Sequence, residues 1–262
     1  MIAGGLAILL SGCHPVVPPR PDVADPAGVL ARATSEAPSG PVYAPFSAVI
    51  GAKGQKITAS GMLVVSPPDR FRVELRGPIG PPQLIVTCNG TDLHAWVAGK
   101  NTYYSGSLAD SSLDGLLGLG GEHVEAGAAA VRLLLGRLPE IPGTPTLSAR
   151  GPVAAAAWAS NGLGSLELGL DGATAHLVQA RATNAAGTVV FSAAWEPGAA
   201  YPSALTAQLP TLEASADLRF GEWAAATPPD AAFDLPAPEG SVLAPLRLTS
   251  DVPPSPAAAP QP

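Results

Sequence analysis

The stretch 70–76, Arg-Phe-Arg-Val-Glu-Leu-Arg, decides the expected fold of this chain. Phe71, Val73 and Leu75 alternate with charged residues, and a period of two is that of a β-strand with one face on a core and one in water. The carboxylate of Glu74 lies between two arginines on the charged face, so we interpret it as a solvated side chain and not as a general acid or base. The stretch therefore predicts an antiparallel sheet with one wet face.

Further strands are expected on the C-terminal side of this stretch. Two apolar runs, 84–88 and 93–97, flank Asn89-Gly90, which is a strong hairpin signal. Similar runs separated by turn residues cover 153–159, 165–170, 175–182, 188–195, 204–209 and 214–220. We predict a mainly β (α+β) fold, a half-open, strongly curved antiparallel β-barrel with a few short helices closing its mouth.

Helical patterns are few. The stretch 126–138 ends before Pro139 and repeats apolar residues at i, i+3, i+4 and i+7. Its apolar face consists of Val131, Leu134, Leu135 and Leu138. A second helix is expected within 108–117, and a short one from Pro26 to Ala33, where proline is tolerated in the first turn. We expect the helix at 126–138 to cover the core of the sheet.

Proline-rich segments mark both ends of the chain. Residues 13–42 contain seven prolines after position 14, and we interpret this range as a tether that the short helix interrupts. Residues 248–262 contain mostly proline and alanine and are expected to be disordered. With a signal peptide at 1–12, the folded domain is predicted to cover 43–247.

Composition limits the classes of function. The 262 residues carry a net charge of −7 without a basic run, which argues against nucleic-acid binding, and 47% of them are hydrophobic, enough for one good core. We find no spacing of nucleophile, base or metal ligands that forms a catalytic constellation, so neither an enzyme nor a metal or cofactor site is expected. His94 is interpreted as a histidine satisfied at a strand edge, and Cys88 as a buried, inert thiol.

The N-terminus carries a processing signal. Residues 1–12 are apolar or small, too few for a membrane-spanning helix, and are followed by Leu10-Ser11-Gly12-Cys13. This motif resembles the lipobox of bacterial lipoproteins, and a plain secretion signal is the alternative. The resemblance implies diacylglycerol and an N-acyl chain on Cys13, which would hold the protein on a membrane. His14 stands where an inner-membrane retention signal would have Asp, which favours the outer membrane, with the protein facing the periplasm.

A longer block, 68–86, reads Pro-Asp-Arg-Phe-Arg-Val-Glu-Leu-Arg-Gly-Pro-Ile-Gly-Pro-Pro-Gln-Leu-Ile-Val and resembles the family of LolB, the outer-membrane lipoprotein receptor. Three further blocks fit in the same order: Tyr103-Tyr104-Ser105, the helix 131–139 and Phe220-Gly221-Glu222-Trp223. The resemblance covers about residues 45 to 225. It departs at 62–65, Met-Leu-Val-Val, where a tryptophan is expected.

The resemblance implies a binding and transfer function. A LolB-like protein accepts acylated lipoproteins from a LolA-like periplasmic carrier, holds their acyl chains in an apolar cavity and inserts them into the outer-membrane lipid. The loop Pro78-Ile79-Gly80 would touch the bilayer, and inserting Ile79 would gain about 1.5–3 kcal/mol. The alternative is that Ile79 folds back onto the core.

The cavity walls implied by the resemblance come from several strands and one helix. The candidates are Phe71, Val73, Leu75, Leu84, Val86, Trp96, Val131, Leu134, Leu135 and Trp158. Trp195 is a further residue that would close the bottom of such a cavity. The same side chains also suit an ordinary core. The alternative function is therefore a lipid-binding, envelope-sensing or structural lipoprotein of the same fold that transfers nothing.

Overall fold

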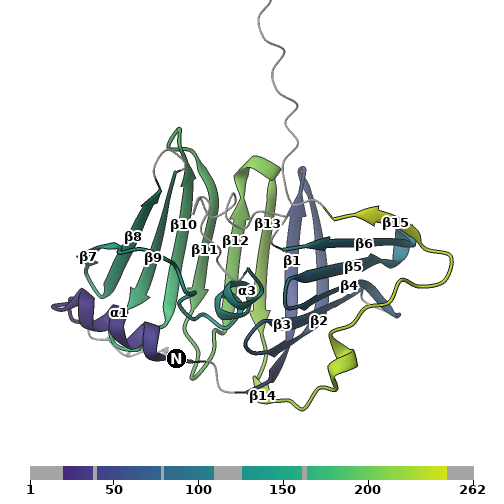
Figure 1. The fold of residues 1–262 in the computed structure, drawn as a ribbon, viewed down its shortest axis with the longest axis horizontal. Coiled ribbons are helices and arrows are strands. Elements are labelled where there is room, and N and C mark those ends of the chain that lie inside the picture. Colours follow the sequence, from purple (N-terminus) through teal and green to yellow (C-terminus); the bar gives the residue numbers. More distant parts are fainter. Residues whose placement is uncertain (1–19, 38–39, 78–79, 109–125, 161–163, 247–262) are drawn as a thin grey trace, which may run out of the picture.

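The computed structural model describes residues 20–37, 40–77, 80–108, 126–160 and 164–246. Its main feature is one sheet of fifteen strands that curves around helix α3 (Ala126–Leu134) (Figure 1). The path through the sheet begins at β15 and ends at β7, and these two edge strands do not pair with each other. The predicted mainly β fold with a strongly curved, half-open sheet is therefore confirmed.

The first half of the sheet is an antiparallel meander that begins with β1 (Val42–Ala52). The strands that follow are β2 (Gln55–Ser66), β3 (Arg70–Arg76), β4 (Pro82–Asn89), β5 (Asp92–Val97) and β6 (Thr102–Ser107), with a 3-10 turn η1 (Ala98–Lys100) before β6. The predicted hairpin between β4 and β5 is present, and its two connecting residues are Gly90 and Thr91. Gly90 has φ of 66°, a conformation that favours glycine.

The second half is another antiparallel meander, in the order of the sequence. Its strands are β7 (Thr146–Arg150), β8 (Val153–Ser160), β9 (Gly164–Asp171), β10 (Leu177–Asn184), β11 (Val189–Glu196), β12 (Ala204–Leu209) and β13 (Ala214–Phe220), with a 3-10 turn η2 (Pro210–Leu212) before β13. The two meanders join where β1 pairs with β13, with Phe46 opposite Phe220. This pairing links residues about 170 positions apart and makes one sheet of the two halves.

A C-terminal segment, 224–246, binds the first meander from outside. It contains β14 (Ala224–Ala225), a 3-10 turn η3 (Asp230–Ala232) and β15 (Val242–Pro245), which pairs in parallel with β6. Phe233 is fully buried, and the guanidinium carbon of Arg70 lies over its ring, 4.9 Å from the ring centre of Phe233. The hydroxyl of Tyr103 donates to the carbonyl oxygen of Leu235 at 2.7 Å. The segment therefore covers the face of the sheet that the sequence predicts to be wet.

The two described helices begin and end where local signals place them. In α1 (Pro26–Ser35) the side chain of Asp25 accepts from the backbone N–H of Gly28, and proline occupies the first turn. Helix α3 ends four residues earlier than the predicted 138, because Gly136 adopts φ of 64° and the N–H of Arg137 bonds back to the carbonyl of Arg132. The helix predicted within 108–117 lies outside the described residues except for Leu108.

The helix α1 also corrects the interpretation of the N-terminal stretch. Val29 and Ala33 are buried against β8 and its neighbours, so 20–36 packs on the sheet instead of forming a free tether. Arg32 donates to the carbonyl oxygen of Gly172 at 2.7 Å. The folded part of the chain therefore begins before the predicted residue 43. No helix within the described ranges is long and apolar enough to cross a membrane.

The apolar interior consists of two clusters of buried side chains. The first cluster lies between β1–β5 and α3 and includes Phe46, Leu63, Val65, Phe71, Val131 and Leu135. The second cluster lies between β8–β12 and α1 and includes Val29, Trp158, Leu166, Leu168, Leu170 and Trp195. Leu218 and Phe220 of β13 pack against both clusters. The core is thus divided along the strand where the two meanders meet.

Candidate functional site

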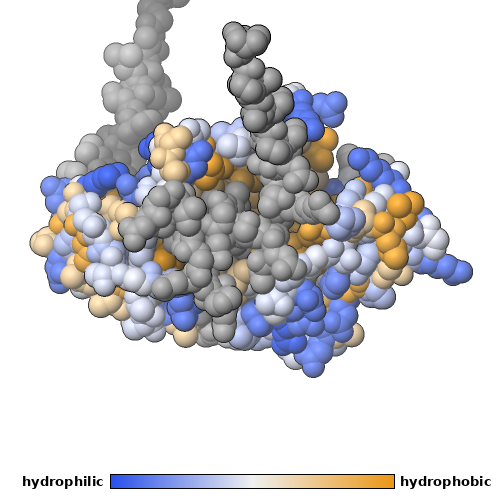
Figure 2. Space-filling model, turned by 45° about the horizontal axis from the view of Figure 1, so that its top comes forward, coloured by the Kyte–Doolittle hydropathy of each residue, from blue (hydrophilic) through white to orange (hydrophobic). Residues whose placement is uncertain are grey.

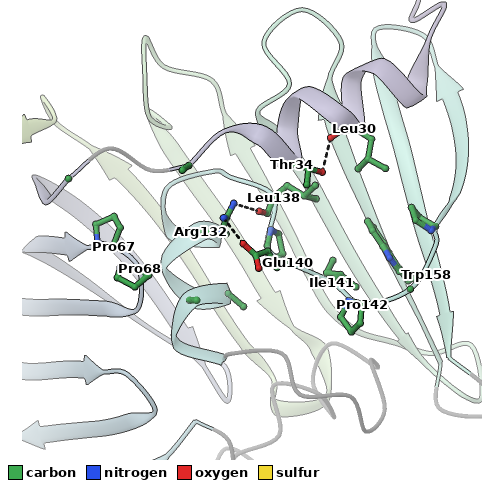
Figure 3. Close-up of a pocket in the computed structure, with 17 residues that line it drawn as sticks. Leu30, Thr34, Pro67, Pro68, Arg132, Leu138, Glu140, Ile141, Pro142 and Trp158 are labelled. Carbon is green, nitrogen blue, oxygen red and sulfur yellow. Dashed lines mark hydrogen bonds and ion pairs between the residues drawn. The ribbon is translucent and has the colours of Figure 1, made fainter.

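A cavity of about 940 Å³ lies on the inner face of the sheet, between the two helices (Figure 3). Its walls come from α1, from the turn Pro67-Pro68 after β2, from α3, from the extended segment 138–145 and from β8. The side chains labelled in Figure 3 are Leu30, Thr34, Pro67, Pro68, Arg132, Leu138, Glu140, Ile141, Pro142 and Trp158. The volume is at the upper end of the range for small-molecule sites, about 300–1,000 Å³.

The local sequence explains why space remains here. Helix α3 presents Ala128 and Ala129 to the cavity, and their single methyl groups cannot reach α1. On α1, Leu30 and Thr34 are four residues apart and therefore lie on one face of the helix. Three prolines in 138–145 remove backbone N–H groups, so this segment borders the cavity without joining the sheet as a strand.

Arg132 is the one cation among the described residues of the cavity wall. It donates to the carboxylate of Glu140 at 2.8 Å and to the carbonyl oxygen of Leu138 at 3.2 Å. The side chain of Arg132 is 14% exposed, whereas that of Glu140 is 83% exposed, so the pair lies at the rim with its carboxylate in water. The cavity can therefore hold an apolar chain and still offer a charged donor to a polar group at its opening.

One ion pair and one hydrogen bond hold the C-terminal end of α1 beside the cavity. The carboxylate of Glu36, the residue that caps α1, pairs with Arg137, and the carbonyl oxygen of Glu36 accepts from Arg132 at 3.5 Å. His176 lies 3.8 Å from the same carboxylate. Burial lowers the pKa of His176, and the nearby Arg137 lowers it further, which keeps the imidazole neutral near pH 7. The C-terminal end of α1 is thus held by the residues that follow α3.

The structure brings most of the predicted cavity residues together, but as packed core. Val73 is paired with Val86, and Leu75 with Leu84, so these side chains share the inner face of the sheet. With Phe71 they belong to the first cluster, which also contains Val131 and Leu134 of α3 and Leu135 just after it. Among the ten predicted residues, only Trp158 lines the 940 Å³ cavity.

Trp96 lies on the other face of the sheet, and its placement in the cavity is wrong. It is paired with Ile85, whose partner on β3 is Glu74. It is also paired with Tyr103, whose hydroxyl donates to the carbonyl oxygen of Leu235 in the C-terminal segment. Its indole N–H donates to the side-chain oxygen of Asn101 at 3.4 Å. The alternation of β5 places Leu93 and Ala95 inward, which turns Trp96 outward.

Two further predicted sites lie mainly outside the described residues. These are the lipidation residue Cys13 and the loop residues Pro78 and Ile79. Gly80, the last residue of the predicted loop, is exposed and has φ of 110°, a conformation that other residues rarely adopt. Lipidation at Cys13 and membrane contact by Ile79 therefore stay predictions.

The residues interpreted as structural have structural partners. His94 shares a 2.9 Å hydrogen bond with the hydroxyl of Tyr103, which confirms it as a satisfied histidine. Cys88 is fully buried, and burial raises the pKa of its thiol to about 12, as expected of an inert cysteine. Burial would raise the pKa of Glu74, but hydrogen bonds from Arg72 and Arg76 outweigh it and lower that pKa. Within the described ranges, no group of His, Cys, Asp and Glu is arranged to hold a metal ion.

Sequence reasoning missed most of the cavity wall. Leu30 and Thr34 fall in the stretch interpreted as a tether, and Pro67, Pro68 and Ile141 fall in connections. The available signal was the amphipathic pattern of α1, in which Val29 and Ala33 mark a buried face next to Leu30. A helix with a buried face cannot be part of a free tether.

Comparisons with known proteins find likeness only in structure. No family model matches the chain, and no curated protein matches it in sequence. A DUF1329-family protein of Desulfovibrio piger is 9% identical, with a TM-score of 0.52 over 81% of this chain and 97% of that one. An outer-membrane lipoprotein-sorting protein domain of Vibrio parahaemolyticus is 9% identical, with a TM-score of 0.50 over 75% and 90%. The chain shares the fold of these two proteins.

A third solved structure, of a LolA-superfamily protein of Nitrosomonas europaea, is 10% identical over 79% of this chain and 96% of that chain, with a TM-score of 0.49. At these identities the likeness concerns the fold alone. The fold agrees with the architecture that the LolB resemblance implies, a curved open sheet whose inner face carries helices.

Proposed function

We propose that this protein is a lipid-anchored acceptor of lipoproteins on the periplasmic side of the outer membrane. It takes acyl chains from a LolA-like periplasmic carrier into its cavity and inserts them into the membrane, with no covalent step. The observation that carries this proposal is the 940 Å³ cavity between α1 and α3 on the inner face of an unclosed sheet. The lipobox at Cys13 and the fold shared with a lipoprotein-sorting domain support it.

The composition of the walls fits an acyl chain. Leu30, Leu138, Ile141 and Trp158 offer apolar surface, and each CH₂ group taken from water gains about 0.8 kcal/mol. Arg132 at the rim offers a donor to the ester or amide oxygens where the chains join the lipoprotein. The cavity is open to solvent and partly polar, so a bilayer buries the chains more completely, and release into the membrane runs downhill.

A transfer assay tests the proposal directly. The full chain with Cys13→Ser, which cannot be acylated, is mixed with a purified carrier loaded with radiolabelled lipoprotein, and liposomes are then added. Movement of the label to this protein and then to the liposomes is the expected result. Failure of the folded protein to take up any label would refute the acceptor function.

A cavity-filling variant locates the binding site. Ala128→Trp places an indole in the space between α3 and α1, and the loss of contact with about two CH₂ groups lowers affinity for a fluorescent fatty acid about tenfold. Ala31→Trp is the matched control, because Ala31 is exposed on α1 and does not line the cavity. Equal affinity of the two variants would show that the probe binds elsewhere.

A substitution in the predicted loop at residues 78–80 distinguishes transfer of a lipoprotein from binding alone. Ile79→Glu removes the aliphatic side chain that the LolB resemblance assigns to the bilayer and adds a charge. In an acceptor that inserts its cargo, uptake from the carrier is retained and insertion into liposomes is lost. If insertion is unchanged, the alternative of a lipid-binding lipoprotein without this transfer step is favoured.

A further inference from the structure

Exposed aliphatic side chains gather along one edge of the sheet. Among the described residues, six large hydrophobic side chains are exposed: Tyr43, Val49, Ile57, Leu212, Val242 and Leu243. The aliphatic members of this set reach 59% exposure at Ile57, 63% at Val242 and 71% at Leu243. Tyr43 belongs to the other end of β1, where it pairs with Val64 and Ala224, and Val49 lies within β1. Isolated exposed aliphatics need no explanation, but the four others share one edge of the sheet.

The strand registers define this edge, which we name the hairpin edge. It consists of the β1–β2, β5–β6 and β12–β13 connections, the paired ends of β3 and β4 at Arg76 and Pro82, and the start of β15. Ala52 is paired with both Gln55 and Ala214, which places the β1–β2 tip beside the β12–β13 turn. Val97 is paired with Thr102, and Thr102 with Val242, which places η1 beside β15. In Figure 1 these ends fan out from the top of the sheet to its right-hand side.

All three lysines of the chain lie on the hairpin edge. Lys53 and Lys56 belong to the β1–β2 tip, and Lys100 ends η1 next to the start of β15. Each is exposed, and none forms an ion pair within the described part of the chain. Two exposed carboxylates, Glu213 and Glu239, lie on the same edge and reduce its positive charge without cancelling it. A chain of net charge −7 therefore carries its free ammonium groups beside its exposed aliphatics.

We infer that the hairpin edge is the surface with which this protein lies on a lipid bilayer. Ile57, Val242 and Leu243 enter the boundary between headgroups and acyl chains, and the lysines extend to lipid phosphates. An anionic surface attracts each basic residue near it, and apolar side chains beside such residues can be buried in the headgroup region. Figure 2 shows hydrophobic beside hydrophilic surface at the right-hand end, where Figure 1 places β15.

This inference rests on the proposed function and gives the protein an orientation. Strands β3 and β4, whose connection carries the predicted insertion residue, also end at the hairpin edge, since Arg76 is paired with Pro82. A lipid on Cys13 would limit how far the folded domain can move from the membrane, but it would not set the orientation of the domain. A second contact along the edge would hold the sheet in one orientation, so that the cargo leaves at a constant height above the bilayer.

Vesicle binding of the full chain carrying Cys13→Ser tests the surface without the anchor. Vesicles of phosphatidylethanolamine with phosphatidylglycerol are used, and flotation measures the bound fraction. Lys53→Gln with Lys56→Gln is expected to weaken binding about 25-fold, since each lysine is worth about fivefold. Arg181→Gln with Arg219→Gln removes the same charge away from the edge and is expected to have little effect because salt screens distant charges.

A second pair of variants, one on the hairpin edge and one control, tests the exposed aliphatic side chains. Leu243→Ser removes an exposed side chain from the hairpin edge and is expected to lower binding to these vesicles at least tenfold. Tyr43→Ser removes one from the other end of β1 and leaves binding unchanged. Melting temperatures equal to that of the parent protein confirm that the variants are folded.

The outcomes separate this inference from the proposed function. Vesicle binding that is lost only in the edge variants, with fatty-acid uptake retained, supports the hairpin edge as the membrane surface. A parent protein that takes up fatty acid and fails to bind vesicles overturns the inference and leaves the acceptor function standing. Equal losses in edge variants and controls also overturn it. Vesicle binding without fatty-acid uptake refutes the acceptor function and retains the edge.

Discussion

The substitution Gly127→Ala tests whether α3 is seated as the structure shows. Gly127 lies in the first turn of α3, and a methyl group there would overlap the carbonyl oxygen of Gly90 and come within 3.1 Å of that of Asp69. These two carbonyls belong to the turns that flank β3 and β4, and both accept from the thiol of Cys88, at 3.6 Å for Asp69 and 3.3 Å for Gly90. Neither can move away without breaking that contact, so α3 itself must shift.

The magnitude follows from two opposing contributions. Overpacking a tight contact costs about 1–3 kcal/mol, and replacing glycine by alanine within a helix gains up to about 1 kcal/mol. The expected net loss is about 1–2 kcal/mol, which lowers the melting temperature of a domain of this size by about 2–8 °C. Because Ala128 and Ala129 line the cavity next to Gly127, affinity for a fluorescent fatty acid should fall as well.

Thermal unfolding followed by circular dichroism measures this effect. Gly99→Ala is the matched control, because a methyl group at that position meets no atom within 4 Å. The control is expected to melt with the parent protein. If Gly127→Ala melts at or above the temperature of Gly99→Ala, then α3 does not press on the two turns, and the description of the cavity wall is wrong.

Three further predictions concern single groups. Cys88, buried with a pKa of about 12, should stay unmodified by iodoacetamide at pH 8 until the protein is denatured, and labelling of the native protein would contradict its burial. Burial would raise the pKa of Asp171, but its hydrogen bonds with Thr174 and Ala173 lower this pKa below 3.8. The contribution of Asp171 to folding stability is therefore present above pH 3.8 and is lost as the pH falls further. Melting curves of Asp171→Asn should show a loss of about 1–2 kcal/mol in stability at neutral pH and a weaker dependence of the melting temperature on acid. Trp195→Phe breaks a 2.9 Å bond to a backbone carbonyl and should cost about 1 kcal/mol more than Trp158→Phe, whose indole N–H has no acceptor among the described residues, and equal melting temperatures would contradict this.

The strands that sequence predicted best are those whose register depends on neighbours in the chain. Alternation at 70–76 and a two-residue turn at Gly90 were enough to predict β3, β4 and β5, because each pair is joined by a short connection. The pairing of β1 with β13 has no such local signal. It depends on which apolar faces remain uncovered once both meanders have formed, and that is a property of the whole chain.

The candidate site was harder to predict than the fold for a related reason. An apolar residue at a strand position satisfies a core and a cavity equally well, so Phe71 and Leu75 could be assigned to either. For Trp96, even the face of the sheet on which the side chain lies was predicted wrongly. The alternation along β5 was the available signal, because Leu93 and Ala95 face the core and Trp96 alternates with them. Most residues that bound the cavity lie instead in connections or on α1 and α3, where prolines and small side chains leave space.

The position of the cavity follows from the division of the core. A sheet this wide has more inner surface than α1 and α3 can cover, and each helix fills the part nearest to it. Val131 of α3 and Leu135, which follows it, pack in the first cluster, while Leu138, after the turn at Gly136, packs in the second. The region between the clusters is bordered by the alanines of α3, by one face of α1 and by the extended segment 138–145. Closing it would need larger side chains at Ala128 and Ala129, and their small size therefore helps to keep the cavity open inside an otherwise packed sheet.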